Sequence, residues 1–238
     1  MEVEKKYFTF PVSLLDGFSK RSQPYTESIK DVTNDIMSYC GYIQALKESG
    51  TSTNEKLNKA GNYFGVTWGN QKEVFDCGKM IDRDNHFPCP MTSVSIEMIF
   101  DFHSKDKTEF EIVCFLAFVA IRSVLQVKPY VKLTNDFLIA RMAGMSNAKE
   151  LHLLPQSLKN YYNRYQLDKI KSELQNNWGL VLYARHTRGF YVSFGKTKLK
   201  DLVLIVEKKR KGYRDKLRKD EQQKAVKEAM NILFPEAT

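Results

Sequence analysis

The chain has 238 residues, of which 42% are hydrophobic and 27% are charged. This length can bury a substantial core, and this balance excludes wholesale disorder. Residues 1–10 contain no apolar secretory run, and the longest apolar stretch, at 112–121, is far shorter than the ~20 residues of a membrane-spanning helix. We therefore expect a folded cytoplasmic protein that does not contact the membrane.

Positive charge is concentrated in one part of the chain, whose formal net charge is +9. Residues 128–219 hold 21 Lys and Arg against 7 Asp and Glu, whereas residues 1–127 hold 14 against 17. Such a basic segment attracts a polyanion by releasing its bound counterions. A lysine-rich face can also serve only to keep a protein in solution. The charge distribution alone leaves both interpretations open.

The first part of the chain, residues 1–92, is predicted to form an α-rich unit that ends in a connector. The alternation of apolar residues at 7–10 favours a strand or an extended arm, and helical spacing predicts helices over 27–47 and 53–64. Residues 66–90 contain several glycines and prolines, which are typical of a connector. We place a domain boundary near its end.

A strongly apolar helix is predicted at the centre of the next part. Thr108 and Glu111 have the spacing of a capping box, which marks the start of a helix. The helix continues to about Val127 and is apolar nearly all round, so it should be buried. The preceding residues, 95–102, are short and amphipathic and fit either a helix or a strand.

Residues 134–146 have the pattern of the first half of a helix-turn-helix. Thr134 can cap a short helix, and Gly144 can end it in the left-handed conformation. Ser146 can then cap the helix that follows. A short helix, a glycine turn and a new helix start are the parts that this motif requires.

The second half of the motif is longer than usual. Residues 147–154 have the character of an insertion, and helical spacing then predicts a long helix over 156–178. Two β-prone runs at 180–185 and 190–194 flank a short polar turn that contains glycine. This arrangement predicts a β-hairpin with a basic tip.

Taken in order, these elements resemble the winged helix-turn-helix family, whose typical mark here is the Ala-Gly-Met-Ser sequence at 143–146. The resemblance implies that the helix within 156–176 lies in the major groove of DNA. It also implies that the hairpin is a wing that contacts the backbone or the minor groove. The insertion departs from the family and leaves open whether reading begins at Ser146, Gln156 or Tyr165.

The predicted fold is therefore mainly α with a small β-hairpin wing, an α+β fold in three parts. The N-terminal α-rich unit covers 1–92, the winged helix-turn-helix covers 93–195 and a basic helical tail covers 196–238. The tail has helical spacing that fits one long or broken helix. Its dense basic run at 208–211 suits phosphate contacts, a solvated face or a dimerising face.

The candidate DNA-binding residues come from the short helix, the long helix, the hairpin and the tail. Asn, Gln and Arg can reach base edges in the major groove, whereas Lys mainly contacts phosphates. The base-reading candidates are Asn160, Asn163, Arg164 and Gln166, and the phosphate candidates are Arg141, Lys159, Lys169 and Lys171; Arg185, His186 and Arg188 belong to the wing, and Lys208, Lys209, Arg210 and Lys211 belong to the tail.

No motif indicates an enzyme, a cofactor, a metal or a small-molecule substrate. Cys77, His86 and Cys89 lack the paired Cys-x-x-Cys spacing of a zinc site. Asp82 and Asp84 alternate with His86 but lack the glycine and the distal Glu of a calcium loop. The sequence contains neither a phosphate-binding glycine loop nor a nucleophile elbow. We expect reduced cysteines and no catalytic residues.

Two functions fit these observations. The first is a non-enzymatic protein that binds double-stranded DNA, as a monomer or a homodimer, in transcription regulation or replication initiation. The order of an α-rich unit followed by a winged helix loosely resembles plasmid and phage replication initiators. The second is a scaffold protein that uses the winged helix to dock another protein. The basic charge of the predicted motif favours the first function.

Overall fold

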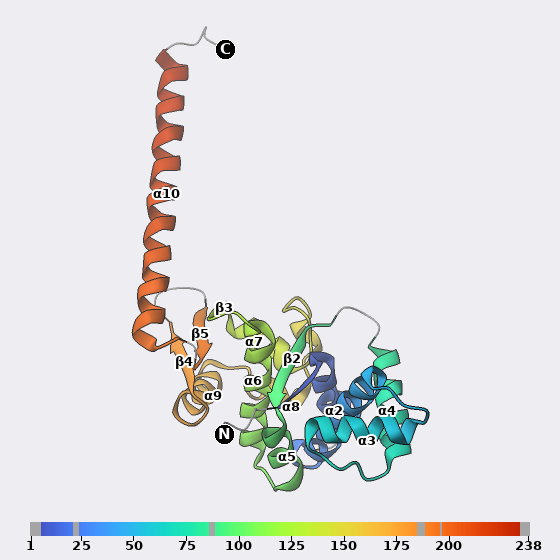
Figure 1. The fold of residues 1–238 in the computed structure, drawn as a ribbon. Helices are drawn as coiled ribbons and strands as arrows, with labels where there is room; N and C mark the ends of the chain where they lie inside the picture. The colour runs from blue at the N-terminus through green and yellow to red at the C-terminus, as the bar shows by residue number, and fades with distance from the viewer. Residues whose placement is uncertain (1–5, 21–23, 86–88, 185–188, 196, 234–238) are drawn as a thin grey trace.

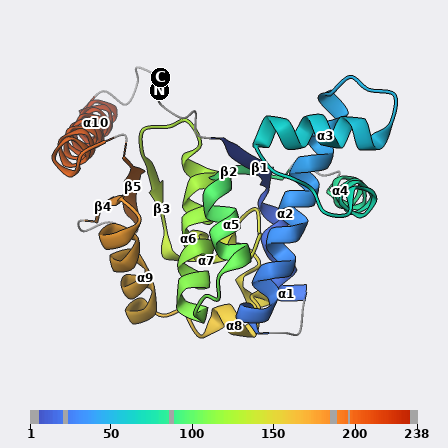
Figure 2. The same ribbon diagram turned by 60° about the horizontal axis from the view of Figure 1, so that its bottom comes forward.

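The chain folds mainly into helices with two small antiparallel sheets, which confirms the predicted fold class at that level. The computed structural model describes residues 6–20, 24–85, 89–184, 189–195 and 197–233. Figure 1 shows a body of packed helices and strands from which one long C-terminal helix projects. In Figure 2, the middle of the chain lies between the N-terminal helices on one side and a C-terminal helix and hairpin on the other.

The N-terminal part begins with a strand that places its aromatic side chains in the core. β1 (Tyr7–Pro11) pairs antiparallel with β2 (Met91–Ser95), and its alternation buries Phe8 and Phe10. The strand-or-arm alternative at 7–10 is therefore resolved as a strand. The other N-terminal elements are η1 (Val12–Asp16), α1 (Gly17–Lys20), α2 (Tyr25–Lys47), α3 (Thr53–Phe64) and α4 (Gln71–Asp84).

The prediction of a connector over 66–90 is wrong for the middle of that stretch, which forms the helix α4. The side chain of Asn70 caps α4 by accepting a hydrogen bond from the backbone N–H of Glu73. Gly78, which has the character of a turn residue in the sequence, lies where α4 packs against α2. A Cβ atom at this position would collide with the backbone of Ser38. This glycine therefore permits close helix packing and does not mark a turn.

The central helix is α6 (Glu109–Leu125), which begins at the predicted capping box. The hydroxyl of Thr108 accepts from the N–H of Glu111, and the Glu111 carboxylate accepts from the N–H of Thr108. Eleven of its seventeen residues are buried, so other elements surround α6 on nearly all sides. α5 (Ile96–Ser104) precedes it and resolves the helix-or-strand alternative at 95–102 as a helix.

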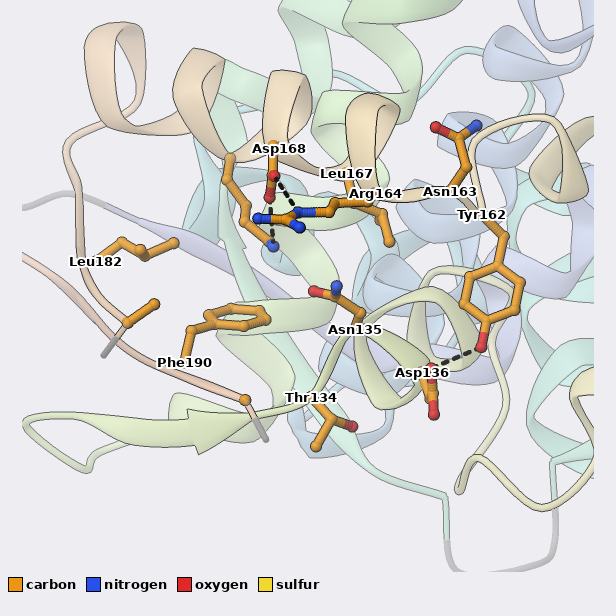
Figure 3. Close-up of a pocket in the computed structure, with 13 residues that line it drawn as sticks. Thr134, Asn135, Asp136, Tyr162, Asn163, Arg164, Leu167, Asp168, Leu182 and Phe190 are labelled. Carbon is orange, nitrogen blue, oxygen red and sulfur yellow. Dashed lines mark hydrogen bonds and ion pairs between the residues drawn. The ribbon is translucent and has the colours of Figure 1, made fainter. Parts of the chain in front are cut away.

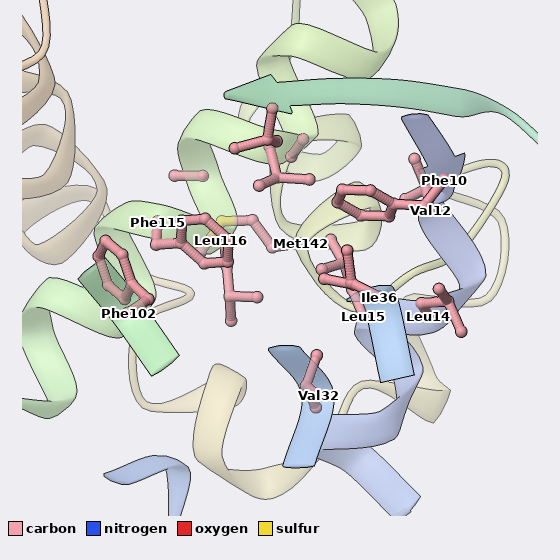
Figure 4. Packing of buried hydrophobic residues seen from close by; sticks show 14 of the residues in the cluster. Phe10, Val12, Leu14, Leu15, Val32, Ile36, Phe102, Phe115, Leu116 and Met142 are labelled. Atoms are coloured by element: carbon pink, nitrogen blue, oxygen red, sulfur yellow. The ribbon is translucent and has the colours of Figure 1, made fainter. Parts of the chain in front are cut away.

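One buried cluster joins the N-terminal part to the rest of the chain. Figure 4 shows Phe10 of β1 in the same cluster as Leu116 of α6 and Met142. The pairing of β1 with β2 also brings together segments from the two sides of the predicted boundary near residue 92. Described residues on both sides of that boundary share a core and a sheet, and the division of the chain there stays a prediction.

The second sheet has three antiparallel strands in the order β3-β5-β4. The predicted hairpin is confirmed as β4 (Leu180–Tyr183) and β5 (Phe190–Phe194). β3 (Val131–Leu133) pairs with β5 and was not predicted. Since side chains alternate along each strand, the sheet has an inner face toward the helices and an outer face. The inner face carries Val131, Leu133, Leu182, Phe190 and Val192, and the outer face carries Lys132, Tyr183 and Tyr191.

The predicted long helix over 156–178 is wrong, because the chain forms two helices there. α8 (Gln156–Lys159) ends after one turn, and four residues separate it from α9 (Arg164–Asn177). Asn163 has an extended backbone between them and caps α9, which separates the two helices. They follow α7 (Asn135–Met142), which Thr134 caps as predicted, and η2 (Leu151–Leu153).

α10 (Leu199–Leu233) is a single long helix whose first turns pack on the outer face of the second sheet. Leu202 and Val206 are buried there, and the Tyr183 hydroxyl donates to Glu207 at 2.6 Å. Beyond these turns the described side chains are exposed, and the helix leaves the body of the molecule (Figure 1). The tail is thus one unbroken helix over the part that the structure describes.

The packing of α4 on α2 predicts opposite effects for two glycine-to-alanine substitutions. Gly78→Ala should destabilise the protein by about 1–3 kcal/mol, because its methyl group has no room beside Ser38. Gly212→Ala in α10, where an added Cβ meets no described atom, should leave stability unchanged or raise it by up to about 1 kcal/mol. Urea unfolding followed by circular dichroism measures both. Equal stability of the two variants would contradict the described α2–α4 contact.

Candidate functional site

A groove of about 750 Å³ lies between the start of α7, the first half of α9 and the β4–β5 hairpin (Figure 3). Leu182 and Phe190 on the inner face of the sheet, together with Leu167 of α9, form its apolar lining. Polar and charged side chains from the two helices complete it. They are Thr134, Asn135 and Asp136 from the start of α7, and Tyr162, Asn163, Arg164, Asp168 and Lys171 from α9 and the residues before it.

Three charged side chains of α9 meet in this groove. Asp168 receives the Lys171 ammonium at 3.1 Å and the Arg164 guanidinium at 3.8 Å. The Lys171 side chain is only 11% exposed, and its nitrogen lies 4.6 Å from the centre of the Phe190 ring. The Arg164 side chain is 93% exposed. Lys171 is therefore held in place, whereas Arg164 can turn toward a ligand while the group keeps a net positive charge.

The start of α7 contributes hydrogen-bonding groups to the same groove. The side-chain oxygen of Asn135 is buried and has no hydrogen-bond partner among the described residues. The Tyr162 hydroxyl donates to Asp136 at 2.6 Å, and this bond to a carboxylate raises the pKa of Tyr162. The first backbone N–H groups of a helix lack partners within the helix and favour negative charge. This end of α7 is therefore suited to a ligand with phosphate oxygens and hydrogen-bond donors.

The solvent-exposed face of α9 carries Lys169, a predicted phosphate contact, together with polar residues that the sequence analysis did not single out. Leu167, Ile170 and Leu174 turn inward and are buried. On the opposite side, the Tyr165 residue is 75% exposed. The predicted helix ran through 160–163, where the chain is not helical, so the polar face assigned to it included Asn160 and Asn163, which lie outside α9. Helical spacing from the three buried residues identifies it as Tyr165, Asp168, Lys169, Ser172, Gln175 and Asn176.

Asn163, predicted to read bases, has a structural role in the free protein. Its side-chain oxygen accepts from the Gln166 N–H at 3.0 Å, and its amide nitrogen donates to the Asn160 carbonyl at 3.0 Å. Both polar ends of the side chain are thus engaged in starting α9. Gln166 is partly buried, whereas Lys159 and Asn160 are exposed at the end of α8.

Arg141, predicted to contact phosphate, lies in the interior, so that prediction does not hold for this structure. The residue is 6% exposed, one guanidinium nitrogen donates to the Ser146 carbonyl at 3.1 Å, and the group lies 5.0 Å from the Phe137 ring centre. Burial lowers the pKa of Arg141. It lies on the inward side of α7 beside Met142, and its contact with Ser146 supports the turn that follows α7.

The remaining predicted cations do not share one face. Lys169 is exposed, and its nitrogen lies 4.6 Å from the centre of the Phe110 ring at the start of α6. Lys209 lies over Tyr130 at 5.0 Å, by the outer face of the second sheet, whereas the groove is on the inner face. Arg210 pairs with Glu207 at 2.9 Å, and Lys208 and Lys211 are exposed. The predicted wing residues Arg185, His186 and Arg188 lie outside the described residues.

The chain was compared with known proteins, and no protein-family model, curated protein or solved structure matches it. In the part of the chain that the structure describes, no helix combines the length and apolarity needed to cross a bilayer. Among those same residues, no group of three or more His, Cys, Asp or Glu side chains is placed to hold a metal ion. The geometry of the groove and of α9 is therefore the basis for a functional proposal.

The cap of α9 gives a test of how the site is held. Asn163→Ala should destabilise the protein by about 1 kcal/mol, because the N–H of Gln166 loses its acceptor. Asn160→Ala is the matched control, since its own side chain is exposed and its carbonyl is kept. Thermal unfolding of both variants measures the difference. The described start of α9 is wrong if Asn163→Ala melts at the same temperature as Asn160→Ala.

Proposed function

We propose that α6, β3, α7, α9, β4 and β5 form a winged helix-turn-helix that binds double-stranded DNA, with α9 as the reading helix. The order of these elements and the sheet order β3-β5-β4 support the proposal. The observation that carries it is the exposed polar face of α9, which stands beside a groove containing Arg164 and Lys171.

The dimensions and chemistry of α9 suit the major groove. Its 14 residues span roughly 21 Å along the helix axis. The diameter of an α-helix fits the major groove, which is about 12 Å wide. Gln175 and Asn176 can donate to and accept from base edges, and Asp168 can accept from the amino group of cytosine. Tyr165 and Ser172 add hydroxyl groups that suit phosphate contacts. α9 thus offers both kinds of contact that sequence-specific binding needs.

The elements next to α9 would position it on the duplex. The start of α7 offers backbone N–H groups to a phosphate, as helix N-termini do in many complexes. The β4–β5 hairpin would lie against the backbone or the minor groove as a wing. Arg164 would exchange its weak contact with Asp168 for a phosphate. Regulation of transcription and initiation of replication are the two processes that we propose for such binding.

Protein docking is the second candidate function. It is favoured by exposed apolar residues of α10, among them Leu204 at 60% and Val226 at 59%. The two functions differ in their response to salt. Duplex binding by phosphate neutralisation weakens steeply as salt rises, whereas docking through apolar side chains does not.

The role of α9 predicts the response of duplex affinity to charge changes in the groove. Arg164→Ala should weaken binding roughly tenfold at low salt and reduce the slope of log affinity against log salt by about 1, because one phosphate contact is lost. Asp168→Asn should tighten non-specific binding, because it removes a negative charge and frees Arg164 and Lys171. Fluorescence anisotropy with a labelled duplex measures both.

Arg83→Ala is the matched control for this experiment. Arg83 is an arginine on α4, 72% exposed and paired with a neighbouring aspartate, as Arg164 is, but it lies in the N-terminal part of the chain. Its removal should leave affinity and salt slope unchanged. α9 would be rejected as the reading helix if neither Arg164→Ala nor Asp168→Asn changes duplex affinity. A salt slope near zero for the parent protein would also reject it.

A further inference from the structure

A cluster of tyrosine and lysine side chains covers part of the outer face of the second sheet. Lys132 of β3 lies 5.9 Å from the ring centre of Tyr191 on β5, and the rings of Tyr191 and Tyr130 are 6.4 Å apart. Lys209 of α10 lies 5.0 Å from the Tyr130 ring centre, and its interaction with Tyr130 raises the pKa of Lys209. The two rings are partly exposed and lie outside the buried cluster.

α10 extends this cluster beyond the edge of the sheet. Tyr213 is one helical turn after Lys209 and is therefore on the same side of the helix. It is 65% exposed, which leaves most of an aromatic ring in solvent on an otherwise polar stretch. Lys208 and Lys211 flank this row and are exposed, and Arg214 follows. Tyrosine rings and basic groups thus alternate from the sheet onto the helix.

Glu207, two residues before Lys209 on α10, is engaged by other residues. Glu207 accepts hydrogen bonds from the Tyr183 hydroxyl at 2.6 Å and from Arg210 at 2.9 Å. These bonds anchor α10 to β4 and neutralise the carboxylate, so Lys132 and Lys209 keep their positive charge for a ligand. The anchoring also fixes the position of Lys209 relative to Tyr130 before any ligand binds, which lowers the entropic cost of binding.

We infer that this outer surface, formed by Tyr130, Lys132, Tyr191, Lys209 and Tyr213, binds single-stranded nucleic acid. Aromatic side chains stack on the faces of unpaired bases, and the interleaved lysines neutralise the phosphates between them. A duplex hides the faces of its bases and cannot use the rings in this way. The surface lies on the opposite side of the sheet from the proposed duplex site, so the two sites do not depend on each other.

The test is anisotropy of a labelled oligothymidine of roughly 12 nucleotides with the full chain, beside an abasic oligomer of the same length and charge. Tyr213→Ala should weaken oligothymidine binding about fivefold or more, because a stacking partner is lost. Tyr213→Trp should restore it, since indole stacks at least as well. Lys209→Gln should weaken both oligomers and reduce the salt slope. The abasic oligomer should bind more weakly than oligothymidine and should not respond to Tyr213→Ala.

Tyr63→Ala is the matched control, because Tyr63 is 55% exposed and also lies beside a lysine, Lys6 at 5.8 Å, but belongs to α3. It should bind oligothymidine like the parent. Arg164→Ala should also bind it normally, which separates this site from the proposed duplex site. Oligouridine is measured in parallel. Tighter binding of oligouridine than of oligothymidine would show that the surface prefers RNA, and weaker binding would show that it prefers DNA. Equal affinity for the abasic oligomer, or no effect of Tyr213→Ala, would overturn the inference.

Discussion

The arrangement of the whole chain depends on the burial of α6. Eleven of its seventeen residues are buried, so the helix has hardly any side that could face water. A helix of this kind is stable only when other elements surround it. β2, η1, α2, α7 and α9 all pack on α6, and α2 and α9 lie on opposite sides of it (Figure 2). Because α7 and α9 both rest on α6, the position of the groove between them follows from the burial of one helix.

The second sheet separates two chemically different surfaces by simple alternation. Leu133 and Phe190 turn toward the helices, and Phe190 forms part of the groove beside Lys171. Lys132 and Tyr191, one residue away on the same strands, turn to the other side. α10 covers only part of that outer face, since Leu202 and Val206 pack near its start and the rest of the helix continues past the sheet. The tyrosines beside it therefore remain partly exposed.

Local signals in the sequence were sufficient for several elements. α3, the capping box of α6 and the hairpin are each specified by neighbours within a few residues. The failures are positions that depend on distant partners. Gly78 is required by the backbone of α2, and β3 is a strand because β5 lies beside it. Arg141 is buried by tertiary packing despite its charge, and Asn163 divides one predicted helix into two. Charge and residue type predicted the basic region of the site but not which side of the sheet each cation occupies.

The most direct test of α9 as a reader of duplex DNA is an amide chemical-shift titration of the full chain with a duplex at low salt. The account predicts that shifts cluster at Tyr165, Ser172 and Asn176 and at the start of α7, while α3 and α4 remain unchanged. Shifts confined to α10, or an unchanged spectrum of α9 with the duplex bound, would contradict it.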